Sequence, residues 1–88
     1  MLESHTTKDF WEMFEQLPTH IQETARLKYE IWKDNSTHPS LHFKKIRNNI
    51  YSARITEDYR VLGVLDEQQI IWFFIGSHSK YDQIISKI

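Results

Sequence analysis

The spacing of hydrophobic residues changes once along this chain, at Leu41. Before this point apolar residues recur every three or four positions, as on one face of a helix. After it they alternate with polar residues, as in a strand with one buried face. A helical pattern of apolar residues does not suit a strand, and a strand pattern does not suit a helix. The sequence therefore predicts two helices followed by a sheet. This is an α+β arrangement.

Two amphipathic helices are expected before Leu41. The first places Phe10, Phe14 and Leu17 on one face and ends at Pro18. Each helix begins with a pair that resembles a capping box, and these pairs are Thr6 with Asp9 and Thr19 with Gln22. The buried stripe of the second helix is expected to be Ile21, Ala25, Tyr29 and Trp32. Since the link is short, the helices should form an antiparallel hairpin.

Four strands are expected after Leu41, over residues 41–46, 50–55, 59–65 and 69–75. Their short polar links predict antiparallel neighbours, and the last strand is apolar on both faces, which favours a central position. Gly63 inside a strand indicates a bulge or a close backbone approach. The predicted fold is an N-terminal antiparallel helical hairpin packed on a twisted antiparallel sheet of three to four strands. Residues 80–88 add a short C-terminal helix or arm.

Composition narrows the functional class. The chain has 88 residues, no Cys and a net charge of −1, and residues 1–88 are expected to form one domain. No signal-peptide pattern and no apolar run of membrane-spanning length occur, so we expect a cytoplasmic protein. Residues 41–60 hold five basic and two acidic side chains, whereas residues 1–40 hold four and seven. This asymmetry indicates an anion-binding face, or else ordinary solvated lysines and arginines.

Two arginines are predicted to face each other on the sheet. If residues 56–58 form the loop between the second and third strands, Ile55 lies opposite Tyr59 and Arg54 opposite Arg60. Like charges in this position repel each other. Either each arginine pairs with its own carboxylate, or both bind one anion, and arginine suits bidentate phosphate binding. The candidate carboxylates are Glu57, Asp58 and Asp82.

A polar cluster follows the fourth strand in the stretch "FFIGSHSKYDQII". Because that strand runs antiparallel to the third, His78 should lie beside Arg54 and Arg60. Imidazole exchanges protons near neutrality, and cations stabilise a phosphorane-like transition state. These groups fit a metal-independent ribonuclease. The structural alternatives are a surface His78, a packed Tyr81 and an Asp82 that forms only an ion pair. A metal site is disfavoured, because His38 and His42 lie on a turn and a strand start, without Cys support.

The order of these elements resembles the RelE/ParE toxin superfamily of bacterial type II toxin–antitoxin systems. The resemblance covers Thr7 to Ile85. Its motifs are "LPTHIQETA", "HPSLHFKKI", "YSARI", "DYRVLGVLD" and "IGSHSKYD". It implies a RelE-like, ribosome-dependent endoribonuclease that cleaves mRNA and inhibits translation. The candidate catalytic residues by this resemblance are Arg54, Arg60, His78 and Tyr81, and the candidate RNA-binding residues are Lys44, Lys45 and Arg47. No cofactor or metal is implied.

Some features depart from the RelE pattern. Ser52 stands where a lysine is frequent, the chain is close to neutral, and "MLESHTT" has little strand character for the family's first strand. Two alternatives therefore stand beside the ribonuclease: a ParE-like toxin that inhibits DNA gyrase without chemistry, and a degenerate member that only binds its antitoxin. The expected partners are a small acidic antitoxin that folds on binding, and the ribosome with its mRNA, or gyrase. No membrane is expected as a partner.

Overall fold

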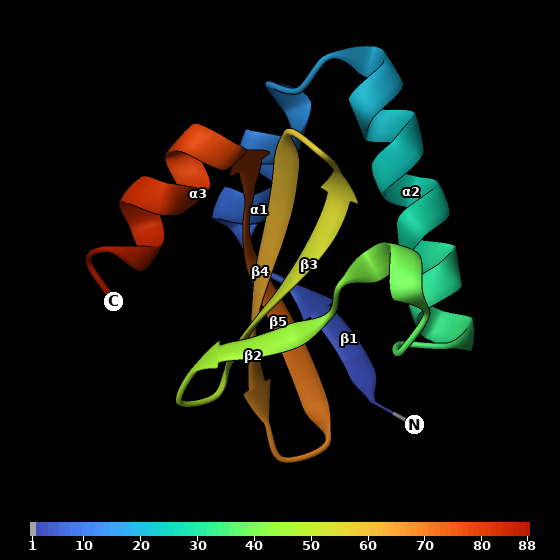
Figure 1. The fold of residues 1–88 in the computed structure, drawn as a ribbon, viewed down its shortest axis with the longest axis vertical. Helices are drawn as coiled ribbons and strands as arrows, with labels where there is room; N and C mark the ends of the chain where they lie inside the picture. The colour runs from blue at the N-terminus through green and yellow to red at the C-terminus, as the bar shows by residue number, and fades with distance from the viewer. Residues whose placement is uncertain (1) are drawn as a thin grey trace.

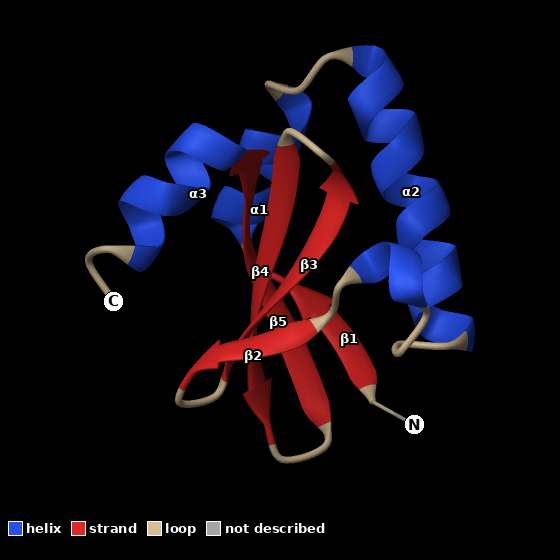
Figure 2. Cartoon of the chain, viewed as in Figure 1, coloured by secondary structure: helices blue, strands red, loops and turns tan. Residues whose placement is uncertain are grey.

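The computed structural model describes residues 2–88 and shows a five-stranded mixed sheet with a helical hairpin and a C-terminal helix (Figures 1 and 2). Its elements are, in order, β1 (Glu3–Thr6), α1 (Lys8–Glu15), α2 (Thr19–Asp34), the 3₁₀ helix η1 (Pro39–Leu41), β2 (Lys44–Arg47), β3 (Ile50–Thr56), β4 (Tyr59–Asp66), β5 (Gln69–Ser77) and α3 (His78–Ile85). The strands lie in the order β1-β5-β4-β3-β2, which confirms the α+β class and places β5 in the interior of the sheet, between β1 and the middle strand β4. No helix in the described part is long and apolar enough to cross a membrane.

The sheet has one strand more than the sequence predicted. β1 pairs with β5 in parallel, from Glu3 opposite Gln69 to Thr6 opposite Trp72, so the sheet is mixed rather than antiparallel throughout. The strand was missed because its residues are polar. In the structure Ser4 accepts a hydrogen bond from the Trp72 indole, and Thr6 accepts one from the Trp11 indole. Two tryptophan donors, one from α1 and one from distant β5, thus use the polar side chains of this edge strand.

The starts of both helices differ from the predicted caps. Thr7, not Thr6, caps α1, where its hydroxyl accepts the amide of Phe10 at 3.1 Å. At α2 no side chain caps the first turn, because Pro18 occupies the cap position and Gln22 donates instead to the carbonyl of Leu17. The first predicted strand also begins later, since Leu41 closes η1 and β2 starts at Lys44.

The sheet separates two hydrophobic clusters. On one face α1 and α2 cover a main cluster of Phe10, Phe14, Ile21, Trp32, Leu41, Ile55, Ile70, Trp72 and Ile75. On the other face α3 covers a smaller cluster of Leu62, Phe74 and Tyr81. Since neighbouring residues of a strand point to opposite faces, the side chains that alternate with the main cluster on β3 and β4 lie on the α3 face. Arg54 and Arg60 are among them.

Gly63 confirms both expectations for a glycine within this strand. The pairing of β4 with β5 shifts between Leu62 and Gly63, where β5 carries the extra residue Phe73. A Cβ atom on Gly63 would lie 2.8 Å from the side chains of both Ile70 and Trp72. Only a residue without a side chain therefore fits against these two core residues.

Gly63→Ala is expected to destabilise the fold by about 1–3 kcal/mol, the usual cost of overpacking a filled core. Urea unfolding followed by tryptophan fluorescence would measure the change, because Trp72 reports on the site of the clash. Gly76→Ala is the matched control, since its added Cβ would meet only the ring of Phe74, at 3.0 Å or more. Equal stabilities of Gly63→Ala and the wild type would contradict the predicted clash.

Candidate functional site

The β3–β4 hairpin carries the two arginines as predicted. Arg54 lies directly opposite Arg60. The turn itself is tighter than expected, because Thr56 pairs with Tyr59 and the register shifts between Arg54 and Thr56. The predicted pairing of Ile55 with Tyr59 is therefore wrong. The irregularity lies beyond the arginine pair, so the two guanidinium groups still leave the same face of the sheet.

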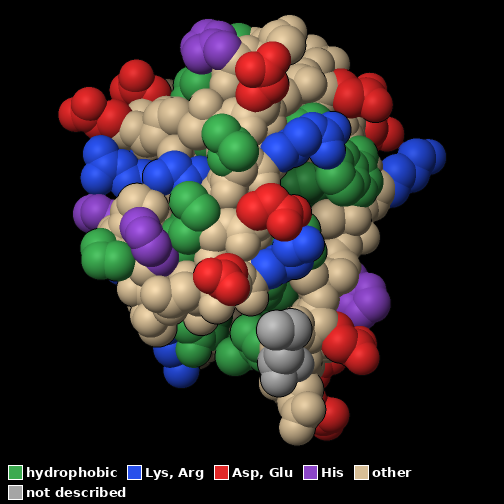
Figure 3. Space-filling view, turned by 90° about the vertical axis from the view of Figure 1, so that its right-hand side faces the viewer, with side chains coloured by type: hydrophobic (Ala, Val, Ile, Leu, Met, Phe, Trp, Pro, Cys, Tyr) green, Lys and Arg blue, Asp and Glu red, His purple; other side chains and the backbone are tan. Residues whose placement is uncertain are grey.

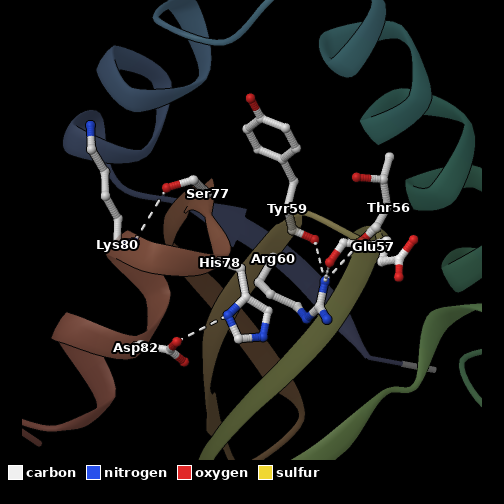
Figure 4. Close-up of polar contacts among 8 residues, drawn as sticks. All are labelled: Thr56, Glu57, Tyr59, Arg60, Ser77, His78, Lys80 and Asp82. Atoms are coloured by element: carbon white, nitrogen blue, oxygen red, sulfur yellow. Dashed lines mark hydrogen bonds and ion pairs between the residues drawn. The ribbon is translucent and has the colours of Figure 1, made fainter.

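Arg60 is held by the carbonyls of the turn. Its Nη1 donates to the carbonyl oxygens of Thr56 at 2.7 Å, Tyr59 at 3.0 Å and Glu57 at 3.1 Å (Figure 4). Neither Arg54 nor Arg60 forms an ion pair with a carboxylate anywhere in residues 2–88. The carboxylates of the turn thus do not neutralise the two arginines. This agrees with the interpretation that both arginines bind one anion.

The start of α3 brings His78 to the arginine pair. Ser77 caps the helix by accepting the amide of Lys80, and the amide of His78 donates to the carbonyl of Asp58 at 2.7 Å. The helix therefore begins at His78, two residues before the predicted segment, and its first turn is attached to the β3–β4 turn. Nδ1 of His78 lies 3.0 Å from Oδ2 of Asp82, so the carboxylate orients the ring. Asp82 thus serves His78 and not an arginine.

A small polar cavity of about 150 Å³ lies between the sheet and α3. Its walls are formed by His42, Lys44, Ser52, Arg54, Arg60, His78 and Tyr81. All four candidate catalytic residues meet here, although they come from three different elements. In Figure 4 the ring of His78 lies between the carboxylate of Asp82 and the side chain of Arg60.

Tyr81 has a packing role as well as a place in the cavity wall. The residue is only 8% exposed and belongs to the cluster with Leu62 and Phe74. Its ring also meets the His78 ring edge to face, with centroids 5.7 Å apart. Tyr81 therefore fixes one side of the imidazole, while Asp82 fixes another.

The three candidate RNA-binding residues do not lie together. Lys44 lines the cavity beside its strand partner Ser52. Lys45 is opposite Tyr51, whose side chain packs against the main cluster on the other face of the sheet. The guanidinium of Arg47 contacts the carbonyl of the C-terminal Ile88. Of the three, only Lys44 is placed to contact an anion held by the arginine pair.

Two further residues line the cavity that sequence reasoning did not place there. His42 was weighed only as a metal ligand, and Ser52 only as a missing lysine. His42 is exposed, and its Nε2 lies 3.5 Å from Nη1 of Arg54. Side chains alternate between the two faces along β3, so Ser52 lies on the same face as Arg54. This alternation could have predicted the place of Ser52 from the sequence. The described residues contain no group of three His, Cys, Asp or Glu arranged to hold a metal ion.

Comparison with known proteins matches the chain to one family model. This model, described as a ParE-like toxin domain, covers residues 19–83. A search of curated protein sequences gives no significant match.

Solved structures share the fold over nearly the whole chain. A chain of the RelB–RelE antitoxin–toxin complex from Methanococcus jannaschii superimposes with a TM-score of 0.73 at 26% identity, covering 90% of this chain and 96% of that one. The archaeal RelE–RelB complex from Pyrococcus horikoshii gives 0.73 at 15% identity, over 90% and 97%. YafQ from Escherichia coli gives 0.67 at 12% identity, over 92% and 98%.

Proposed function

Since the chain belongs to the ParE-like toxin family, we propose that it is the toxin of a type II toxin–antitoxin system and cleaves mRNA on the ribosome. One observation carries the proposal. The polar cavity gathers two arginines that pair with no carboxylate of the described residues, a lysine, a histidine oriented by a carboxylate, and a tyrosine. These are the groups that a phosphate ester needs for binding and for proton transfer without a metal.

Each residue has a distinct role in the proposed reaction. Arg54 and Arg60 hold the scissile phosphate and stabilise the charge that builds up on its oxygens. His78 transfers a proton at the reacting oxygens through Nε2, because Nδ1 is engaged with Asp82. Tyr81 packs against the imidazole and orients it. The small volume of the cavity, about 150 Å³, suits one phosphate group rather than a nucleoside.

The direct test is cleavage of mRNA on programmed ribosomes by the purified protein. Primer extension would locate the cut, and the 3′ end of the product would be analysed for a 2′,3′-cyclic phosphate. Cleavage that needs ribosomes, and that is absent for free mRNA, is the expected result. An intact message in the presence of a folded, toxic protein would overturn the proposal.

Lys44→Ala is expected to slow ribosomal mRNA cleavage by roughly tenfold, because it removes a positive charge next to the bound phosphate. Lys45→Ala is the matched control, with the same charge change one residue away on the opposite face of the sheet. Rates of both variants would be measured at several salt concentrations. An equal effect of the two substitutions would show that β2 contributes only a diffuse charge.

Gyrase inhibition is the second candidate, and the family model favours it by its ParE-like description. The net charge of −1 also fits a target other than RNA. A supercoiling assay with purified gyrase separates the two functions. Inhibition of supercoiling that survives His78→Gln would support this candidate, because binding without chemistry does not need the imidazole.

An antitoxin is the proposed partner, and the structure offers it an apolar groove. The groove has a volume of about 790 Å³ and runs between α2, α1 and the sheet. Its walls include Trp11 and Leu27, which are 43% and 66% exposed. Figure 3 shows this side of the molecule, where hydrophobic side chains lie between charged ones. Such a surface fits an amphipathic segment that orders when it binds.

Leu27→Glu is expected to weaken binding of a cognate antitoxin by at least about tenfold, because it places a charge in an apolar contact. Calorimetric titration would measure the affinity. Cleavage activity should stay unchanged, since Leu27 lies away from the polar cavity.

Hydrogen exchange with and without antitoxin is the complementary measurement. Protection confined to surfaces remote from residues 41–60 and 76–88 would show that neutralisation does not act on the site directly.

A further inference from the structure

His42 shares the polar cavity with His78 and the arginine pair. It reaches this place from the end of η1, just before β2. The backbone of His42 is left-handed, with φ 47°. Glycine and asparagine adopt this conformation more readily than histidine. Histidine is nevertheless among the non-glycine residues that are enriched in this conformation, so the turn accommodates this side chain.

We propose that His42 is a second proton-transfer residue of this site. His42 receives the proton of the ribose 2′-hydroxyl, and His78 protonates the leaving 5′-oxygen. The inference rests on the ribonuclease function proposed above and adds to it the identity of the base. Two imidazoles in one phosphate-sized cavity supply both halves of an acid–base pair.

The charges around the two rings differ, and this difference assigns the roles. His42 faces Arg54 on β3, Lys44 on β2, and Arg60, His78 and Tyr81 across the cavity. No Asp or Glu occurs among the described residues that line the cavity. A proton on His42 would therefore add a positive charge to a cationic wall. The surroundings of His42 suit a neutral ring that accepts a proton as the reaction proceeds.

In the part of the chain that the structure describes, His78 has a carboxylate partner and His42 has none. Oδ2 of Asp82 lies 3.0 Å from Nδ1 of His78, so a protonated ring there would form an ion pair. The other groups facing it are Tyr81 on α3 and Arg60 on β4. These surroundings suit a ring that carries a proton and delivers it from Nε2.

The proposed step is a transesterification without water or a cofactor. His42 removes the proton of the 2′-hydroxyl, and the 2′-oxygen forms a bond to phosphorus. The bond from phosphorus to the 5′-oxygen breaks, and this oxygen takes the proton of His78. The products are a 2′,3′-cyclic phosphate and a 5′-hydroxyl end. Solvent then accepts the proton from His42 and supplies a proton to His78, which restores both rings.

The test variant is His42→Asn, because asparagine tolerates the left-handed backbone and does not titrate near neutrality. His42→Gly is a second variant with even less backbone strain. His20→Asn, on the exposed surface of α2, is the matched control. Single-turnover cleavage of mRNA on ribosomes would be followed from acidic to alkaline pH. Thermal unfolding would establish that each variant is folded.

The wild-type rate should fall at both low and high pH, the bell-shaped profile expected when a general base and a general acid act together. His42→Asn should cleave roughly 10²-fold more slowly, as for loss of a general base, and should no longer show the fall at low pH. His20→Asn should match the wild type. If the wild type cleaves RNA and His42→Asn has the same rate and the same pH profile, the role of His42 is wrong and the ribonuclease function stands. A wild type that cuts no RNA would overturn the ribonuclease function and this role together.

Discussion

His78→Gln is expected to slow cleavage of ribosome-bound mRNA by about 10²–10⁴-fold, the usual contribution of general acid–base catalysis. Glutamine keeps a hydrogen-bonding side chain at the start of α3 but does not titrate near neutrality. The attachment of α3 to the β3–β4 turn should survive, because it uses the backbone amide of this residue. Single-turnover cleavage and expression toxicity would be measured together.

Two neighbours of His78 provide the controls. Tyr81→Phe keeps the edge-to-face contact with the imidazole and removes only the hydroxyl, so a smaller loss is expected than for His78→Gln. Asp82→Asn removes the carboxylate 3.0 Å from Nδ1 and should slow cleavage, because the imidazole loses the charged group that orients it. If His78→Gln and Tyr81→Phe both cleave within a few-fold of the wild type, the cluster after β5 is structural.

Arg54→Ala is expected to cleave about 10²–10³-fold more slowly, as when one preorganised charge for the transition state is removed. The variant should remain folded, because within residues 2–88 the Arg54 side chain forms no ion pair and its hydrogen bond to His42 is long, at 3.5 Å. Arg54→Lys should recover part of the rate, since a lysine keeps the charge but loses the bidentate geometry. Burst kinetics would separate phosphate binding from the chemical step.

Arg60→Ala should lose activity and also some stability, because three turn carbonyls accept hydrogen bonds from its Nη1. Arg60→Ala should therefore lose both activity and stability, whereas Arg54→Ala should lose activity alone. Arg26→Ala is the matched control, since this arginine lies over the ring of Phe14, away from the polar cavity. A folded Arg54→Ala that cleaves as fast as Arg26→Ala would exclude the phosphate role.

The sequence predicted those parts of the fold that depend on local patterns. The period change at Leu41 separated helices from strands, and the short loop before Tyr59 was enough to place Arg54 opposite Arg60. The antiparallel pairing of the last two strands then predicted that the polar residues after β5 lie beside these arginines. Gly63 was identified as a position of bulging or close approach, and both occur there.

The missed features depend on contacts between distant parts of the chain. β1 is polar, and its stability comes from pairing with β5 and from the indole of Trp72, which no local pattern reveals. His42 has a left-handed backbone conformation and lies in a turn outside any strand. The alternation of side chains along a strand therefore could not predict which face of the sheet it lies on. Its place in the cavity follows only from how η1 turns the chain towards β3.

The position of β5 also determines when the site can exist during synthesis. β5 lies between β1 and β4, so the sheet cannot be complete until residues 69–77 have left the ribosome. His78 and Tyr81 follow directly on α3 and emerge later still. A nascent chain therefore holds both arginines of the hairpin before any proton-transfer group of α3 can join them. Long-range pairing of this kind is slow to form, so the cavity is expected to be among the last parts of the domain to assemble.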